Sequence, residues 1–137
     1  MRSVATFLAL SGSDRRLLLR ALATIARVRI GLRLQSIERL KAWSRQAKAG
    51  EIPADRLSWA VRVAARRLPG TSCLASALAL QRLLSQQGLV SELHIGVARQ
   101  AGAFAAHAWL THRGEIVIGA EQHEDYTQLV AWPSNPA

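Results

Sequence analysis

Cysteine is almost absent from this chain of 137 residues, which has one residue of that type, Cys73. A single thiol cannot form an intramolecular disulfide, and it cannot by itself provide a thiolate metal site. The chain is therefore compatible with a reducing compartment, and we expect a cytoplasmic protein. Its length suits one folded unit with a single modest core.

Long hydrophobic runs are also absent. No uninterrupted apolar stretch approaches the roughly 20 residues that a membrane-spanning helix needs. The short apolar run near the N-terminus is broken by the polar residues 11–14, and no small-residue cleavage site follows it. A signal peptide is therefore not expected.

Acidic residues are scarce only in the first half of the chain. Residues 1–68 contain 15 Lys and Arg against 4 Asp and Glu, whereas residues 69–137 contain 3 against 5, and together they give the net charge of +9. The simplest interpretation is a solvated basic face over a helical core, although such a face can also bind an acidic partner, an anionic membrane or a nucleic acid. Nucleic-acid binding is disfavoured, because the aromatic residues of this half are few and no RRM, KH or zinc-finger motif is present.

Amphipathic periodicity predicts helices over residues 14–34, 34–48 and 54–68. The first begins at an N-cap of Ser13 or Asp14. Its apolar stripe comprises Leu17, Leu18, Ala21, Leu22, Ile25 and Val28. The stretch GEIPAD supplies Gly and Pro as a break before the third helix. We expect a basic helical extension over residues 1–52 and a second unit over residues 53–137.

The only cysteine opens the fourth predicted helix. Thr71 or Ser72 serves as its N-cap, and the helix runs from Cys73 to Gln87 before Gly88 ends it. Unpaired N–H groups and the positive end of the helix dipole favour a thiolate at this position. The same N–H groups can stabilise the oxyanion formed when the sulfur attacks a carbonyl group. A small buried thiol without chemical function is the alternative interpretation.

Three strands are expected after this helix, over residues 90–98, 103–112 and 115–119, with a tight turn at HRGE. In the second strand, alternation places His107 and Trp109 on one face and Ala106, Ala108 and Leu110 on the other. The small neighbours of His107 leave room for a helix end, which predicts the thiol–imidazole pair that cysteine-dependent acyl transfer requires.

The other histidines are weaker candidates for the base. His94 lies on the first strand and is expected at the edge of the core, whereas His112 and His123 are expected at exposed loop positions. No pair of histidines has the helical spacing or the carboxylate cluster of a recognised metal site. We predict neither a metal nor a cofactor.

Three stretches of the chain form a familiar combination: SCLASALALQRLLSQQGLVSELHIGV, AHAWLTHRGEIVIGAE and the closing YTQL. Together they resemble the transglutaminase-like leader peptidases of lasso-peptide biosynthesis, and the resemblance covers roughly residues 55–130. It implies an α+β, papain-like fold with the catalytic helix packed on a small antiparallel sheet and with helices before it. It also implies that Cys73 is the nucleophile and His107 the general base of an enzyme that removes the leader from a ribosomally made precursor peptide.

The resemblance implies an acidic residue that orients the imidazole, usually an Asp shortly after the hairpin turn. This chain departs from that pattern, because Gly119 and Ala120 lie at the nearest positions. Glu121 is the first carboxylate available, and we assign the orienting role to it. Asp125 and Glu124 are the alternatives.

Partners also follow from the resemblance: a separate leader-recognition protein and an ATP-dependent, macrolactam-forming cyclase. The basic helices are the expected docking surface for such a partner, for an acidic leader or for a peripheral membrane contact. The alternative to an enzyme is a non-catalytic module on the same scaffold that binds a peptide or an anionic surface.

Overall fold

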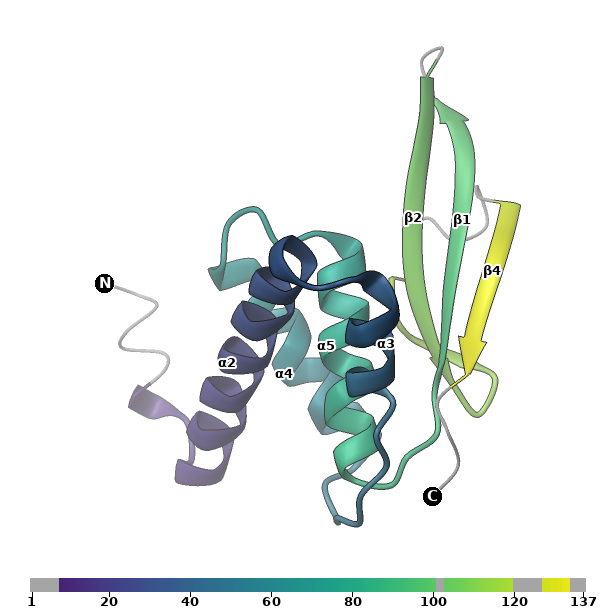
Figure 1. Cartoon of the computed structure of the whole chain (residues 1–137). Helices are drawn as coiled ribbons and strands as arrows, with labels where there is room; N and C mark the ends of the chain where they lie inside the picture. The colour runs from purple at the N-terminus through teal and green to yellow at the C-terminus, as the bar shows by residue number, and fades with distance from the viewer. Residues whose placement is uncertain (1–7, 101–102, 120–126, 134–137) are drawn as a thin grey trace.

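The computed structural model describes residues 8–100, 103–119 and 127–133. Within them, helices α2–α5 precede strands β1–β4, and the helices pack against one side of the sheet (Figure 1). This arrangement confirms the predicted α+β class with a helical N-terminal part. None of the helices in the described ranges is long and apolar enough to cross a membrane.

Helix α2, Gly12–Leu34, begins earlier than predicted. Its N-cap is Ser11, whose Oγ accepts a hydrogen bond from the Asp14 backbone N–H at 3.1 Å. The predicted N-caps, Ser13 and Asp14, lie inside the first turn instead. There Asp14 forms an ion pair with Arg56 at 2.6 Å, and its negative charge complements the helix dipole.

The other helices follow the predicted order. Helix α3 spans Ile37–Ser44 and ends before the predicted position, whereas α4 spans Ala54–Arg67 and α5 spans Cys73–Gln86. Ser72 is the N-cap of α5, and Gly88, with a φ of +73°, follows its last turn. A left-handed glycine at this position ends a helix without steric cost.

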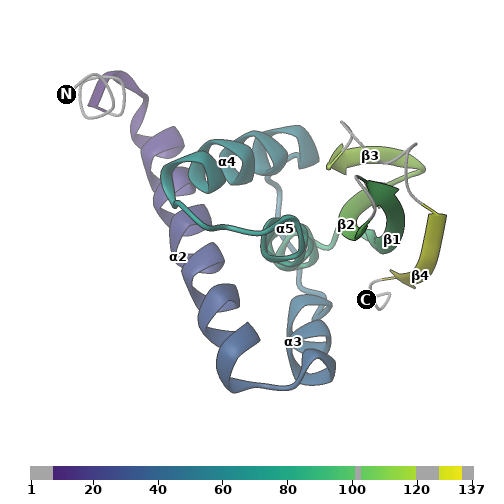
Figure 2. The ribbon, with the colours of Figure 1, turned by 90° about the horizontal axis from the view of Figure 1, so that it is seen from above.

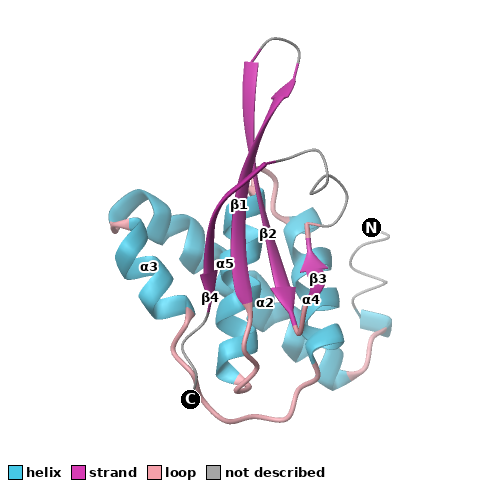
Figure 3. Cartoon of the chain, turned by 90° about the vertical axis from the view of Figure 1, so that its right-hand side faces the viewer, coloured by secondary structure: helices cyan, strands magenta, loops and turns pink. Residues whose placement is uncertain are grey.

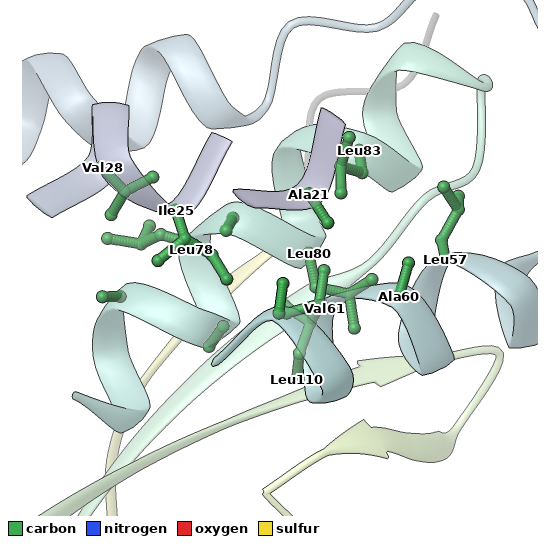
Figure 4. Packing of buried hydrophobic residues seen from close by; sticks show 14 of the residues in the cluster. Ala21, Ile25, Val28, Leu57, Ala60, Val61, Leu78, Leu80, Leu83 and Leu110 are labelled. Carbon is green, nitrogen blue, oxygen red and sulfur yellow. The ribbon is translucent and has the colours of Figure 1, made fainter. Parts of the chain in front are cut away.

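Helix α5 lies at the centre of the molecule. Viewed end-on, it is surrounded by α2, α3, α4 and the sheet (Figure 2). Because it has neighbours on every side, its buried positions lie all round the helix rather than along one stripe. Figure 4 shows the core residues that α2, α4, α5 and β2 contribute. They include Ala21, Ile25, Val28, Leu57, Ala60, Val61, Leu78, Leu80, Leu83 and Leu110.

One hydrophobic cluster therefore contains residues from both sides of the predicted boundary at 52/53. Leu17 and Ile25 of α2 belong to the same cluster as Leu78 of α5. The division into two units stays a prediction, and the two parts share a core.

The strands form one antiparallel sheet in the order β3-β2-β1-β4 (Figure 3). Their bounds are Glu92–Gln100 for β1, Ala103–His112 for β2, Glu115–Ile118 for β3 and Thr127–Pro133 for β4. The predicted tight turn joins β2 to β3 through Arg113 and Gly114, both at positive φ, as a type I′ hairpin turn requires. Strand β4, which pairs with β1, was not predicted.

The predicted alternation in β2 is confirmed at its described positions. Ala108 and Leu110 belong to the core, whereas the rings of His107 and Trp109 stack on each other with their centroids 5.8 Å apart. Gly96 of β1 lies opposite His107, so no side chain stands across from the imidazole.

Candidate active site

A pocket of about 330 Å³ opens where the first turn of α5 meets β2, β3 and α4. Cys73 and His107, the pair predicted from the sequence, both line it. The other lining residues are Arg62, Ala65, Arg66, Ser76, Ala108, Ile116, Val117, Ile118 and Gly119.

Local structure places the Cys73 thiol at the pocket. Gly70, at a φ of +81°, turns the chain after α4, and Thr71 Oγ1 donates to the Leu68 carbonyl at 2.7 Å. Ser72 Oγ then accepts from the Ala75 N–H at 3.1 Å, which caps α5. The Cys73 side chain is exposed, so the interpretation as a buried structural thiol is wrong.

The edge of β2 faces this thiol. Pairing between β2 and β3 reaches Leu110 opposite Ile118 and goes no further toward His107. Beyond that point, the Ala108 N–H donates to Cys73 Sγ at 3.4 Å. This contact joins the start of α5 to the residue next to His107.

The His107 ring is oriented by a backbone carbonyl. Its Nε2 lies 2.9 Å from the Gly119 oxygen. A carbonyl oxygen only accepts hydrogen bonds, so Nε2 carries the proton, and in the neutral ring Nδ1 is then the basic nitrogen. Glu121, Asp125 and Glu124, the carboxylates predicted for this orienting role, lie outside the described residues.

Gly119 is held close to β2. Its φ is +87°, a conformation that side chains disfavour. A Cβ at this position would lie 2.8 Å from the Trp109 Cβ and 2.9 Å from the Ala108 oxygen. Only glycine therefore fits without a shift of the neighbouring backbone, and this close fit fixes the carbonyl that His107 contacts.

Of the other histidines, His94 and His112 are not among the described residues that line the pocket. His94 Nε2 lies 2.9 Å from Thr111 Oγ1. The His94 ring stacks on Trp109, its cross-strand partner on β2, with the ring centroids 5.5 Å apart. His112 is half-buried, and its Nδ1 bonds the Val90 carbonyl at 2.7 Å, so the expectation of an exposed loop position is wrong for it. His123 lies outside the described residues.

The two charged residues of the pocket that were not singled out from the sequence are Arg62 and Arg66. Both are on α4, four residues apart, and therefore on one face of that helix. Their spacing was visible in the sequence, but the packing of α4 on β3 was not. Across the described part of the chain, no group of three His, Cys, Asp or Glu side chains is placed to hold a metal ion.

Comparison with known proteins gives one family. The sequence model of the transglutaminase-like superfamily matches residues 16–131. This range includes α2 and α3 as well as the pocket. Neither the curated proteins nor the solved structures gave a match.

Proposed function

Because this chain belongs to the transglutaminase-like superfamily, which often contains cysteine peptidases, we propose that it is a cysteine peptidase acting through Cys73 and His107. One observation carries the proposal: the thiol at the start of α5 and the imidazole of β2 line a single pocket, and the N–H of Ala108 contacts the sulfur. The resemblance of the segments around both residues to lasso-peptide leader peptidases supports a finer assignment. The substrate is then a ribosomally made precursor whose leader is removed.

In the proposed reaction, His107 Nδ1 accepts the proton of the Cys73 thiol, and the sulfur attacks the scissile carbonyl carbon. The oxyanion that forms accepts hydrogen bonds from free N–H groups in the first turn of α5. When the C–N bond breaks, His107 gives its proton to the leaving amine, and the acyl group stays on the sulfur. Water then attacks the acyl-enzyme, His107 takes its proton, and breaking of the C–S bond returns the thiol.

The Gly119 carbonyl supports this cycle as a positioning group. It fixes the proton on Nε2, so that the base faces the substrate through Nδ1, and it stabilises the imidazolium that forms transiently. Glu121 stays the predicted acidic member of the triad, and in that role it would share the Nε2 proton with the Gly119 carbonyl.

Partners remain part of the proposal. A separate leader-recognition protein would deliver the precursor, and an ATP-dependent cyclase would use the product. We place all three in the cytoplasm, since a single free cysteine suits a reducing compartment. The arginines of α2 supply a basic surface on which an acidic partner can dock.

Mass spectrometry of a lasso-type precursor, incubated with this protein and a leader-recognition partner, tests the function. We expect cleavage at one leader–core junction, and we expect none with Cys73→Ala, whose exposed side chain can be replaced without loss of fold. His94→Gln is the matched control for His107→Gln, and it should retain cleavage. If a bound, cognate precursor stays intact with the wild-type protein, the non-catalytic binding module becomes the better explanation.

A further inference from the structure

We propose that Arg62 and Arg66 form a carboxylate-binding subsite beside Cys73, so that the preferred substrate carries an acidic side chain close to the bond that is cut. This inference rests on the proposed function, because it names the class of peptide that the same pocket takes. Both arginines line the pocket together with Cys73 and His107.

The packing of α4 directs both arginines toward this pocket. Ser58 Oγ donates a hydrogen bond to the Val117 carbonyl, which fastens one face of α4 to β3. Arg62 and Arg66 follow Ser58 at intervals of four residues and therefore continue the same face. On this face, Arg62 and Arg66 line the same pocket as the β3 residues and the Cys73 thiol.

The two guanidinium groups lack acidic neighbours in the described part of the chain. Neither has a hydrogen bond or an ion pair there, and no Asp or Glu is among the described residues that line the pocket. Arg56, earlier on the same helix, is different, because it is paired with Asp14 at 2.6 Å. Both the Arg62 and the Arg66 side chain are exposed.

The chemistry of the pocket selects the ligand. A guanidinium group binds a carboxylate through two parallel N–H···O bonds, and two such groups on one helix face strengthen the positive field beside the start of α5. The pocket also has an apolar wall, which consists of Ile116, Val117 and Ile118. An Asp or Glu side chain on an extended peptide fits both features, since its methylene groups contact the apolar wall while its carboxylate meets the arginines.

Alkylation of Cys73 by two probes that differ in charge tests the subsite without any peptide. Iodoacetate is an anion and iodoacetamide is neutral, and the chain has one cysteine, so every adduct reports this thiol. At low ionic strength we expect Arg62→Gln and Arg66→Gln each to lower the iodoacetate-to-iodoacetamide rate ratio about threefold, and the double variant about tenfold. Unchanged iodoacetamide rates show that the fold and the thiol are intact.

Two control variants separate a local subsite from net charge. Arg39→Gln, at an exposed position of α3, removes the same charge from the far side of α5 and should leave the ratio unchanged (Figure 2). Arg62→Lys keeps the charge and should retain most of the ratio. The proposal is overturned if the iodoacetate-to-iodoacetamide rate ratio of the double Gln variant equals that of the wild type. It is also overturned if Arg39→Gln lowers the ratio as much as Arg62→Gln or Arg66→Gln does.

Peptides then separate the subsite from the proposed function. The peptides are precursors that have either Asp or Asn beside the junction, and each is made with blocked termini and with a free C-terminal carboxylate. We compare the rates at which the wild type and the Arg62→Glu/Arg66→Glu variant cleave them. Faster cleavage of the blocked Asp peptide by the wild type alone supports the subsite. If the peptides are cleaved without this preference, or with a preference for the free C-terminus only, the subsite proposal is overturned and the proposed peptidase function is kept. If no peptide is cleaved but iodoacetate is still steered by the arginines, the subsite stands and the peptidase fails.

Discussion

Replacement of Gly119 by alanine measures how closely the site depends on one backbone position. An alanine at positive φ costs about 1 kcal/mol relative to glycine. At Gly119 its methyl group would also meet the Trp109 Cβ at 2.8 Å and the Ala108 oxygen at 2.9 Å. Overlap of this kind in a packed region adds about 1 to 3 kcal/mol, so we expect a total loss of about 2 to 4 kcal/mol in the free energy of unfolding.

Gly114 provides the matched control. Its φ of +79° is close to the +87° of Gly119, but a Cβ there would have no atom within 4 Å. Gly114→Ala should therefore show the conformational cost alone, about 1 kcal/mol. For a chain of this length, 1 kcal/mol corresponds to about 3 to 4 °C in the midpoint of thermal unfolding.

Thermal unfolding followed by circular dichroism checks this difference. We expect a midpoint lowered by about 3 °C in Gly114→Ala and by about 7 to 14 °C in Gly119→Ala. Equal shifts for the two variants would refute the close approach of Gly119 to β2. The argument that this approach fixes the carbonyl partner of His107 would then fail as well.

Three further predictions concern the support of the site. Leu78→Ala, at a fully buried position of α5, should lower the free energy of unfolding in urea by about 3 kcal/mol, because it leaves a cavity. Ser72→Ala removes the cap of α5 and should cost about 1 kcal/mol in the same assay while it slows alkylation of Cys73. Burial and the nearby charges of Arg27 and Arg20 lower the pKa of Arg82. Added salt screens the repulsion among these arginines and should therefore raise the midpoint of thermal unfolding, and this rise should be smaller in Arg27→Gln.

Features that depend on local sequence were predicted well. The apolar stripe of α2, the start of α5 at Cys73 and the bounds of β2 all follow from periodicity, capping and alternation, which act within a few residues of the chain. The start of α2 was misplaced because Ser11, Ser13 and Asp14 are all good capping residues. In the structure Ser11 caps the helix and Asp14 pairs with Arg56 of α4, a contact that the local pattern does not contain.

Features that depend on packing between distant segments were not predicted. The role of the Gly119 carbonyl has no side-chain signature, since every residue carries the same acceptor. Strand β4 is defined by its pairing with β1, and a short segment ending in Pro133 gives a weak strand signal. Arg62 and Arg66 were assigned to a solvated face, because only the contact between Ser58 and Val117 reveals where that face points.

The core that α2 shares with α5 also bears on how such chains can recombine. A crossover near residue 52 would cut through one hydrophobic cluster, so that an α2 from a relative would meet an α5 surface that it had not evolved to fit. Because α5 begins at Cys73, a packing mismatch along its buried length would shift the position of the thiol. Helices α2 and α3 should therefore be inherited together with the pocket rather than exchanged as an independent module.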